Sequence, residues 1–473
     1  MDLQILYQER YGSQVIYGLV SLALLGVITA VATEQIWLSI LIPAVIIGAY
    51  AIFYNTRLLY GALFMMIPLS AEISIGGGLS TDLAGEPILW ILSGCTMLLL
   101  ITRGLPSRVF STITFLIVLH LIWIFISALF AFDTMIAIKY TLAKLWYVLP
   151  LYLLPFYLIN DRTDIRFLFK CFIAGTLIGA IYFFAQHFQT DLSYASRTNA
   201  GQPIWRNHVN YACTLVLTLP LTWYLYKTSR SVDRWLYFLL ASLILFFIYF
   251  AYARIAYLSL LAAGIYYLVL IGRLTRPVII LSMCIAVLSS AWLIHEDHYL
   301  DFAPNYERTI RQGDFSSKIS ATAQGTDIST MERLHRWVAG GHMVKDNPIT
   351  GVGPGNFHNS YRPYTVFSFE TYVSDNPEKS GIHSHFLMVL VEQGILGLIF
   401  WLSLLISALI FIERRYHREQ DSRALLVLCG CTLAMILTIN LVNDMIEVIK
   451  VGGLFFFILF LLQSQLNKEG SLT

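Results

Sequence analysis

Residues 167–187 read FLFKCFIAGTLIGAIYFFAQH, and Lys170 is the one residue among them that carries a full charge at neutral pH. A helix needs about 20 predominantly apolar residues to cross the hydrocarbon core of a membrane. Comparable runs occupy residues 14–33, 36–54, 278–294 and 424–442. Because these runs are continuously apolar and do not alternate with period two, they predict membrane-spanning helices and exclude a β-barrel.

The composition of the whole chain agrees with this prediction. Of its 473 residues, 57% are hydrophobic and 13% are charged, and the mean hydropathy is +0.67. Soluble domains carry about a quarter charged residues. We predict an all-α polytopic membrane protein with about 12–14 transmembrane helices, each close to the length that spans a bilayer. The boundary between two neighbouring spans is hardest to place within residues 235–271, which form one apolar stretch interrupted only near Tyr252-Ala253-Arg254. The formal net charge of +2 gives no indication of nucleic-acid binding, and we expect none.

The distribution of Lys and Arg predicts the orientation of the chain. One alternate set of loops holds most of the positive charge: Arg57, Arg103, Arg108, Arg162, Arg166, Lys227, Arg230, Arg234, Arg273, Arg276, Arg414, Arg415, Arg418 and Arg423. The opposite short loops hold Lys139, Arg197, Arg206, Arg254 and Lys450. Since cytoplasmic loops are enriched in Lys and Arg, we expect both termini in the cytoplasm.

One connection, from His295 to about Ile382, is far longer than the others and falls on the outer side by the same alternation. Loops longer than about 15 residues are usually functional or disordered. We therefore divide the chain into an N-terminal transmembrane bundle over residues 1–294, a loop domain over residues 295–382, and C-terminal transmembrane helices with a short cytoplasmic tail over residues 383–473.

The long loop carries signs of folded structure. Ser329 and Glu332 have the spacing of a capping box, in which each side chain satisfies a backbone N–H at the start of a helix. The helix would extend to about Lys345 and end before Asn347-Pro348, and the glycine-rich residues 351–355 would form the tight turn that follows.

Five arginines fall on the predicted outer side, against the usual charge bias. They are Arg197, Arg206, Arg254, Arg333 and Arg336, and the last two share one face of the predicted loop helix. A planar guanidinium stays charged and binds phosphate oxygens through two parallel hydrogen bonds, which suits a lipid diphosphate at the edge of the bilayer. The alternative is that each arginine reaches lipid headgroups or pairs with a local carboxylate.

His383-Ser384-His385 stands where the loop re-enters the membrane. A neutral imidazole can accept a hydroxyl proton at neutral pH, because its ordinary pKa is about 6.5. On this pattern alone a structural role for the histidine is the more common outcome.

The segment that begins at His383-Ser384 and continues, after nine residues, to Gly394 and Gly397 resembles the signature of the O-antigen ligase family. Residues 333–337, 347–348, 351–353 and 355–357 also resemble segments of the wider ligase and polymerase family, in its usual order. Arg254 with the apolar residues after it, and Arg197 with residues 207–212, resemble further family segments. The resemblance covers about residues 190–465. One departure is the number of spans, because a count of about 14 exceeds the family's usual twelve by two.

The resemblance implies a GT-C-like fold and a metal-independent, inverting glycosyltransferase without a cofactor, in the bacterial inner membrane. It would move a glycan from an undecaprenyl-diphosphate carrier to an acceptor hydroxyl, such as one on the lipid A-core, on the periplasmic side. His383 would be the catalytic base and the five arginines would bind the donor diphosphate, whereas Ser384, Gly394 and Gly397 would support the motif. Trp205, Trp337 and Tyr361 would be candidates for a sugar-binding cleft.

Three other functional hypotheses remain open: a polymerase, a glycan transporter, and a receptor or scaffold with a periplasmic domain, in which the arginines and His383 would be dispensable. A polymerase would use another lipid-linked repeat as its acceptor. A glycan transporter should show two pseudo-symmetric halves with polar groups at mid-membrane, whereas we find no such halves and few mid-span charges, of which Lys144 and Lys170 are the clearest. His295-Glu296-Asp297-His298 contains potential metal ligands, but four adjacent residues rarely converge on one ion, and we expect no metal site.

Overall fold

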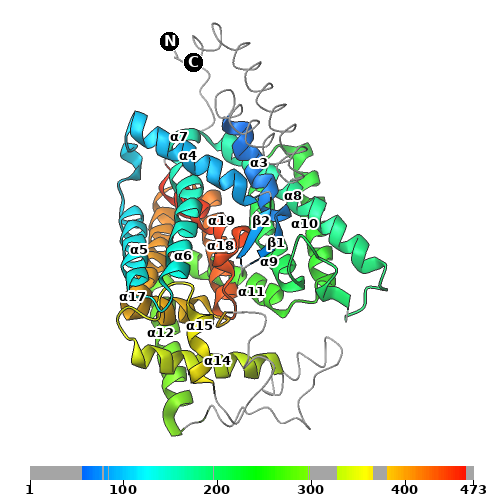
Figure 1. Ribbon diagram of the computed structural model, residues 1–473. Coiled ribbons are helices and arrows are strands. Elements are labelled where there is room, and N and C mark those ends of the chain that lie inside the picture. The colour runs from blue at the N-terminus through cyan, green and yellow to red at the C-terminus, as the bar shows by residue number, and fades with distance from the viewer. Residues whose placement is uncertain are drawn as a thin grey trace, which may run out of the picture.

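The computed structural model describes residues 56–76, 79–83, 85–194, 196–296, 298, 328–365 and 381–464. Nine helices within these ranges are long and apolar enough to cross a membrane, which confirms the prediction of an all-α polytopic membrane protein (Figure 1). The predicted spans at residues 14–33 and 36–54 lie outside the described residues, so the total number of spans stays a prediction.

The long helical segments are α4 (Gly85–Arg103), α5 (Thr112–Leu129), α6 (Thr134–Val148), α8 (Arg162–Phe188), α9 (His208–Thr228), α10 (Ser231–Phe250), α11 (Arg254–Ile271), α12 (Thr275–Ile294), α14 (Ile328–Asp346), α17 (His385–Arg418) and α18 (Arg423–Leu441). Shorter elements are α3 (Thr56–Leu69), η1 (Ser107–Val109), η2 (Leu149–Leu153), α7 (Pro155–Leu158), η3 (Ser196–Thr198), α15 (Phe357–Tyr361), η5 (Arg362–Tyr364), η7 (Met445–Glu447) and α19 (Ile449–Gln463). One antiparallel hairpin, β1 (Ala71–Gly76) and β2 (Leu79–Leu83), accompanies them.

The centre of the bundle is formed by helices that are apolar around their whole circumference, as buried helices are. Figure 1 shows α18 and α19 surrounded by other helices. In α19, Phe457 packs edge-on against Phe64 of α3, with ring centroids 4.6 Å apart, and against Phe169 of α8. α12 differs, since most of its described side chains are exposed apolar groups that suit contact with lipid.

The apolar stretch over residues 235–271 divides where the sequence predicted. α10 ends at Phe250 and α11 begins at Arg254. Tyr252, between them, has a φ of 50°, a left-handed conformation that a continuous α-helix does not contain. The charged Arg254 therefore lies at the end of a span and not inside one.

The predicted loop helix is present as α14, and it lies with α15 at one end of the bundle (Figure 1). The described helix begins at Ile328, so Ser329 lies inside it and is not the N-cap; this detail of the prediction was wrong. Since the two residues are adjacent, the error is within the usual uncertainty of a helix boundary. The loop has a small core of its own, in which Ala339 and Met343 of α14 pack near Val391 of α17.

Gly394 explains how the loop is attached to the membrane helices. Its φ of 69° breaks the helical pattern within α17, and a Cβ at this position would overlap the carbonyl oxygen of Ile349. The carbonyl groups of Val391 and Glu392, just before the break, accept hydrogen bonds of 3.0 and 2.9 Å from the backbone N–H groups of Val352 and Gly353. The glycine thus allows a loop turn to approach the helix backbone closely.

Candidate functional site

His383 lies between the loop and the first turn of α17. Its φ of 57° places a non-glycine residue in the left-handed region, which persists only where neighbouring contacts hold it. Burial, followed by the positive charges of Arg333, Arg336 and Arg206, lowers the pKa of His383 to about 3. The imidazole is therefore neutral at neutral pH and has a nitrogen that can accept a proton.

Three of the five predicted arginines act electrostatically on His383, and they come from two distant segments. Arg333 and Arg336 lie one turn apart on α14, and Arg206 lies in the connection between α8 and α9. Arg336 is 2% exposed and donates a hydrogen bond of 2.6 Å to the carbonyl oxygen of Gly381. Arg206 is exposed. The site thus combines a buried arginine that holds the backbone with an exposed one that a ligand can reach.

Arg197 and Arg254 form a second group. The guanidinium of Arg197 lies 3.4 Å from the ring centroid of Tyr194. Burial, together with the positive charge of Arg254, lowers the pKa of Arg197. Arg254 therefore acts on Arg197, whereas Arg206, Arg333 and Arg336 act on His383.

A buried lysine, Lys450, is hydrogen-bonded to the segment that carries Arg206. Lys450 of α19 is 4% exposed and donates hydrogen bonds to the carbonyl oxygens of Ser70 and Ile204. Trp205 is fully buried, and the Lys450 ammonium lies 5.3 Å from its ring centroid. The expectation that Trp205 lines an open sugar-binding cleft is therefore wrong, because its ring is part of the bundle core.

The connection between α18 and α19 contributes residues that sequence reasoning missed. The backbone carbonyl of Asn443 accepts a hydrogen bond of 3.0 Å from the N–H of His385. The carboxylate of Asp444 lies directly against Gly381, where it would overlap a Cβ. Burial raises the pKa of Asp444, whereas the charges of Arg336 and Arg206 oppose that rise. In the sequence, the acidic residues Asp444 and Glu447 were the one indication that this connection could belong to the site.

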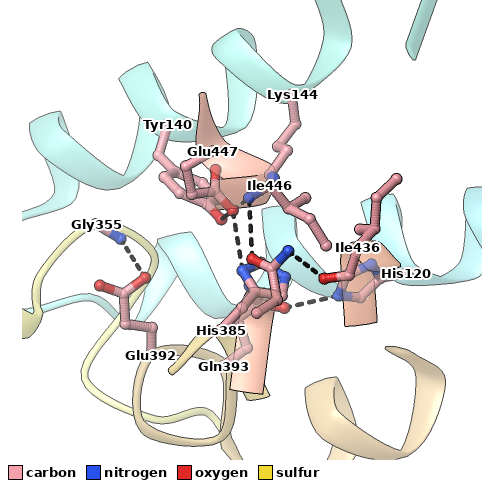
Figure 2. Close-up of polar contacts among 11 residues, drawn as sticks. His120, Tyr140, Lys144, Gly355, His385, Glu392, Gln393, Ile436, Ile446 and Glu447 are labelled. Atoms are coloured by element: carbon pink, nitrogen blue, oxygen red, sulfur yellow. Dashed lines mark hydrogen bonds and ion pairs between the residues drawn. The ribbon is translucent and has the colours of Figure 1, made fainter. Parts of the chain in front are cut away.

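A buried polar cluster lies beside the first turn of α17 (Figure 2). Glu447 Oε1 accepts hydrogen bonds from Lys144 Nζ at 2.7 Å and from the Tyr140 hydroxyl at 2.9 Å. His385 Nδ1 lies 3.5 Å from the same oxygen, which is long for a hydrogen bond, and this nitrogen has no hydrogen-bond partner among the described residues. Next to this group, His120 Nε2 lies 2.8 Å from Gln393 Oε1.

The supporting residues of the motif have structural positions. Ser384 is buried at the N-cap of α17, without a side-chain hydrogen bond to the helix backbone. Gly397 allows Trp123 of α5 to approach α17, since a Cβ there would lie 3.3 Å from the Trp123 ring. Glu392 is buried, and its carboxylate accepts hydrogen bonds from the N–H groups of Gly355 and Phe357 at 2.8 and 3.1 Å.

The histidines after α12 converge more than expected. Potential ligand atoms of His295, Glu296 and His298 lie within 4.8 Å of one another. Asp297 lies outside the described residues. His298 also stacks on Trp292, with ring centroids 4.9 Å apart. Glu296 has a φ of 53°, so these three residues approach one another where the backbone leaves the helical conformation. The expectation of no metal site stays a prediction.

These observations describe a multi-pass membrane protein in which His383 lies near Arg206, Arg333 and Arg336, where α14 and α15 meet the helix bundle. The family model described as O-antigen ligase matches residues 238–402, which include His383, Arg254, Arg333 and Arg336. Residues 238–402 are thus similar to an O-antigen ligase domain, and this match supports an assignment to the O-antigen ligase and polymerase family. The family implies a glycosyltransferase-like enzyme that uses lipid-linked glycans. A comparison with curated proteins found no match.

Proposed function

We propose that this protein transfers a glycan from an undecaprenyl-diphosphate carrier to an acceptor hydroxyl at the periplasmic face of the bacterial inner membrane, as an O-antigen ligase. The observation that supports this proposal best is the neutral His383 beside Arg206, Arg333 and Arg336. A proton acceptor adjacent to several fixed positive charges is the arrangement that displacement of a diphosphate requires.

The reaction is a single displacement. The acceptor oxygen forms a bond to the anomeric carbon while the bond from that carbon to the diphosphate oxygen breaks. The acceptor proton passes to the His383 imidazole, and the diphosphate leaves with the bonding electrons. Attack from the face opposite the leaving group inverts the anomeric configuration.

In this proposal the arginines replace a metal ion. Arg206 and Arg333 bind the diphosphate, and the buried Arg336 holds the backbone at Gly381 while adding to the local positive potential. Arg197 and Arg254 would bind a more distant part of the donor. A bound diphosphate offsets the arginine charges, so the pKa of His383 should rise from about 3 when the donor binds. Donor binding thus makes His383 a stronger base at the moment when one is needed.

The test is transfer by the purified full-length protein in lipid nanodiscs. Undecaprenyl-diphosphate-linked repeats are supplied with or without lipid A-core. Transfer that occurs only when lipid A-core is present, with no chain growth in its absence, supports a ligase. Chain growth without lipid A-core would replace that assignment by polymerase, and the absence of any transfer by an intact, inserted protein would overturn the proposed function.

A further inference from the structure

We propose that Lys144 and Glu447, which form a partly buried ion pair, position the His383 segment, and that both act as positioning residues for the transfer. This inference rests on the proposed function for its effect on turnover. Neither residue lies within the matched O-antigen ligase domain, which covers residues 238–402.

The first step is the placement of the charges. Lys144 lies on α6, in a membrane-spanning helix, and its side chain is 9% exposed. Glu447 lies in η7, and its side chain is 26% exposed. Its Oε1 accepts hydrogen bonds from both Lys144 and Tyr140. An ionisable residue within a transmembrane helix is costly and generally marks a function. A charge pair is also a poor source of stability, because removing two charges from water offsets most of their attraction.

The second step connects this pair to His383. The Glu447 carboxylate lies 3.5 Å from the ring of His385, two residues after His383. The N–H of His385 also donates to the carbonyl oxygen of Asn443, four residues before Glu447. The connection between α18 and α19 therefore touches His385 at two points, through one hydrogen bond and one longer side-chain contact, and Lys144 of α6 pairs with the same connection.

The third step is the space beside His385. A cavity of about 20 Å³ is lined by His385, Lys144, Tyr140, His120 and Gln393, among others. This volume exceeds the roughly 10–15 Å³ that one water molecule requires. The ring of His385 is therefore not packed tightly on this side, so loss of the Lys144–Glu447 pair should let this segment, and His383 with it, shift.

The discriminating variant is the double replacement Lys144→Met and Glu447→Gln. Removing both charges together leaves no unpaired buried charge, so folding should be retained where single replacements could fail. Its matched control is Arg57→Met with Asp164→Asn, which removes an ion pair of 3.1 Å between α3 and α8. Lys144→Arg, which keeps the charge, provides the conservative variant.

Two measurements decide the proposal. The first is hydrogen exchange of a peptide spanning residues 381–388 in the detergent-purified protein, and the second is the steady-state kinetics of transfer. We expect faster exchange in the double variant, a fall in kcat of about 10-fold to 100-fold from misplacement of the base, and a donor KM within about 2-fold of the unaltered value. Lys144→Arg should retain more turnover than Lys144→Met, and the control pair should change neither measurement.

Unchanged exchange in the double variant would overturn the proposal, whatever happens to turnover. Faster exchange with unchanged kcat would overturn the positioning role, as would a rise in KM with kcat retained. If the unaltered protein transfers no glycan, the proposed function fails, and the exchange measurement alone still decides whether this ion pair holds the His383 segment.

Discussion

Arg336 donates a 2.6 Å hydrogen bond to the carbonyl oxygen of Gly381, so an arginine from the loop helix fixes the backbone two residues before His383. On the other side of His383, the N–H of His385 is bonded to the connection between α18 and α19. His383, whose φ is 57°, thus lies between an attachment to α14 and an attachment to the α18–α19 connection.

Replacement of His383 by Ala should abolish most transfer. General-base catalysis contributes about 10²-fold to 10⁴-fold, so kcat should fall by that range while the protein is still inserted and recovered in normal amounts. Transfer is measured in nanodiscs, with His358→Ala as a histidine control from the same loop. Full activity in the His383 variant would refute the catalytic assignment.

The pH dependence of transfer should differ between free enzyme and complex. His383, with a pKa of about 3, is already neutral across the physiological range, so kcat/KM should show no loss from its protonation as pH falls from 8 to about 5. If the donor diphosphate binds beside His383 as proposed, it should raise this pKa, and the acid limb of kcat should then lie at higher pH than that of kcat/KM. Coincident acid limbs would contradict binding of the diphosphate next to His383.

Lysine should not replace Arg206 or Arg333. If each guanidinium binds the diphosphate through two parallel hydrogen bonds, Arg206→Lys and Arg333→Lys should keep the charge but lose the second bond. We expect kcat/KM for the donor to fall by about 10-fold or more, as for loss of one charged hydrogen bond. The exposed Arg362, measured as Arg362→Lys, is the control. Full activity of the lysine variants would show that charge alone suffices.

Gly394→Ala should destabilise the attachment of the loop. The added Cβ meets the Ile349 carbonyl, and a residue forced to a positive φ costs about 1–3 kcal/mol. The thermal unfolding temperature should fall, and proteolysis within the loop should become faster. Gly264→Ala in α11 is the matched control, because a Cβ there meets nothing within 4 Å. Equal stability of the two variants would contradict this account of the motif.

Chelation should leave transfer unchanged if arginines supply the positive charge. The purified protein is treated with EDTA and assayed beside the His295→Ala and His298→Ala variants, which remove two of the three converging side chains. A loss of transfer on chelation that Zn²⁺ restores, and that these variants reproduce, would instead assign a metal to that cluster.

The sequence predicted the helical membrane class, the break before Arg254 and the loop helix, because each depends on local composition. It could not predict which arginines meet His383, since Arg206 and Arg333 are brought together only by packing of distant helices. Glu447 was missed for the same reason: its partner Lys144 is about 300 residues away in the chain, and a single sequence contains no signal for such a pair. Lys144 was noted as a mid-span charge, but without a partner.

The location of the Lys144–Glu447 pair also restricts how members of the family could be recombined. A chimera that exchanged only residues 238–402 would transplant His383 without the α6 lysine or the η7 glutamate that face its neighbour. Such a hybrid would have to carry a compatible α6 and α18–α19 connection from the same parent. The segment that must be exchanged as one unit is therefore larger than the matched range of residues 238–402.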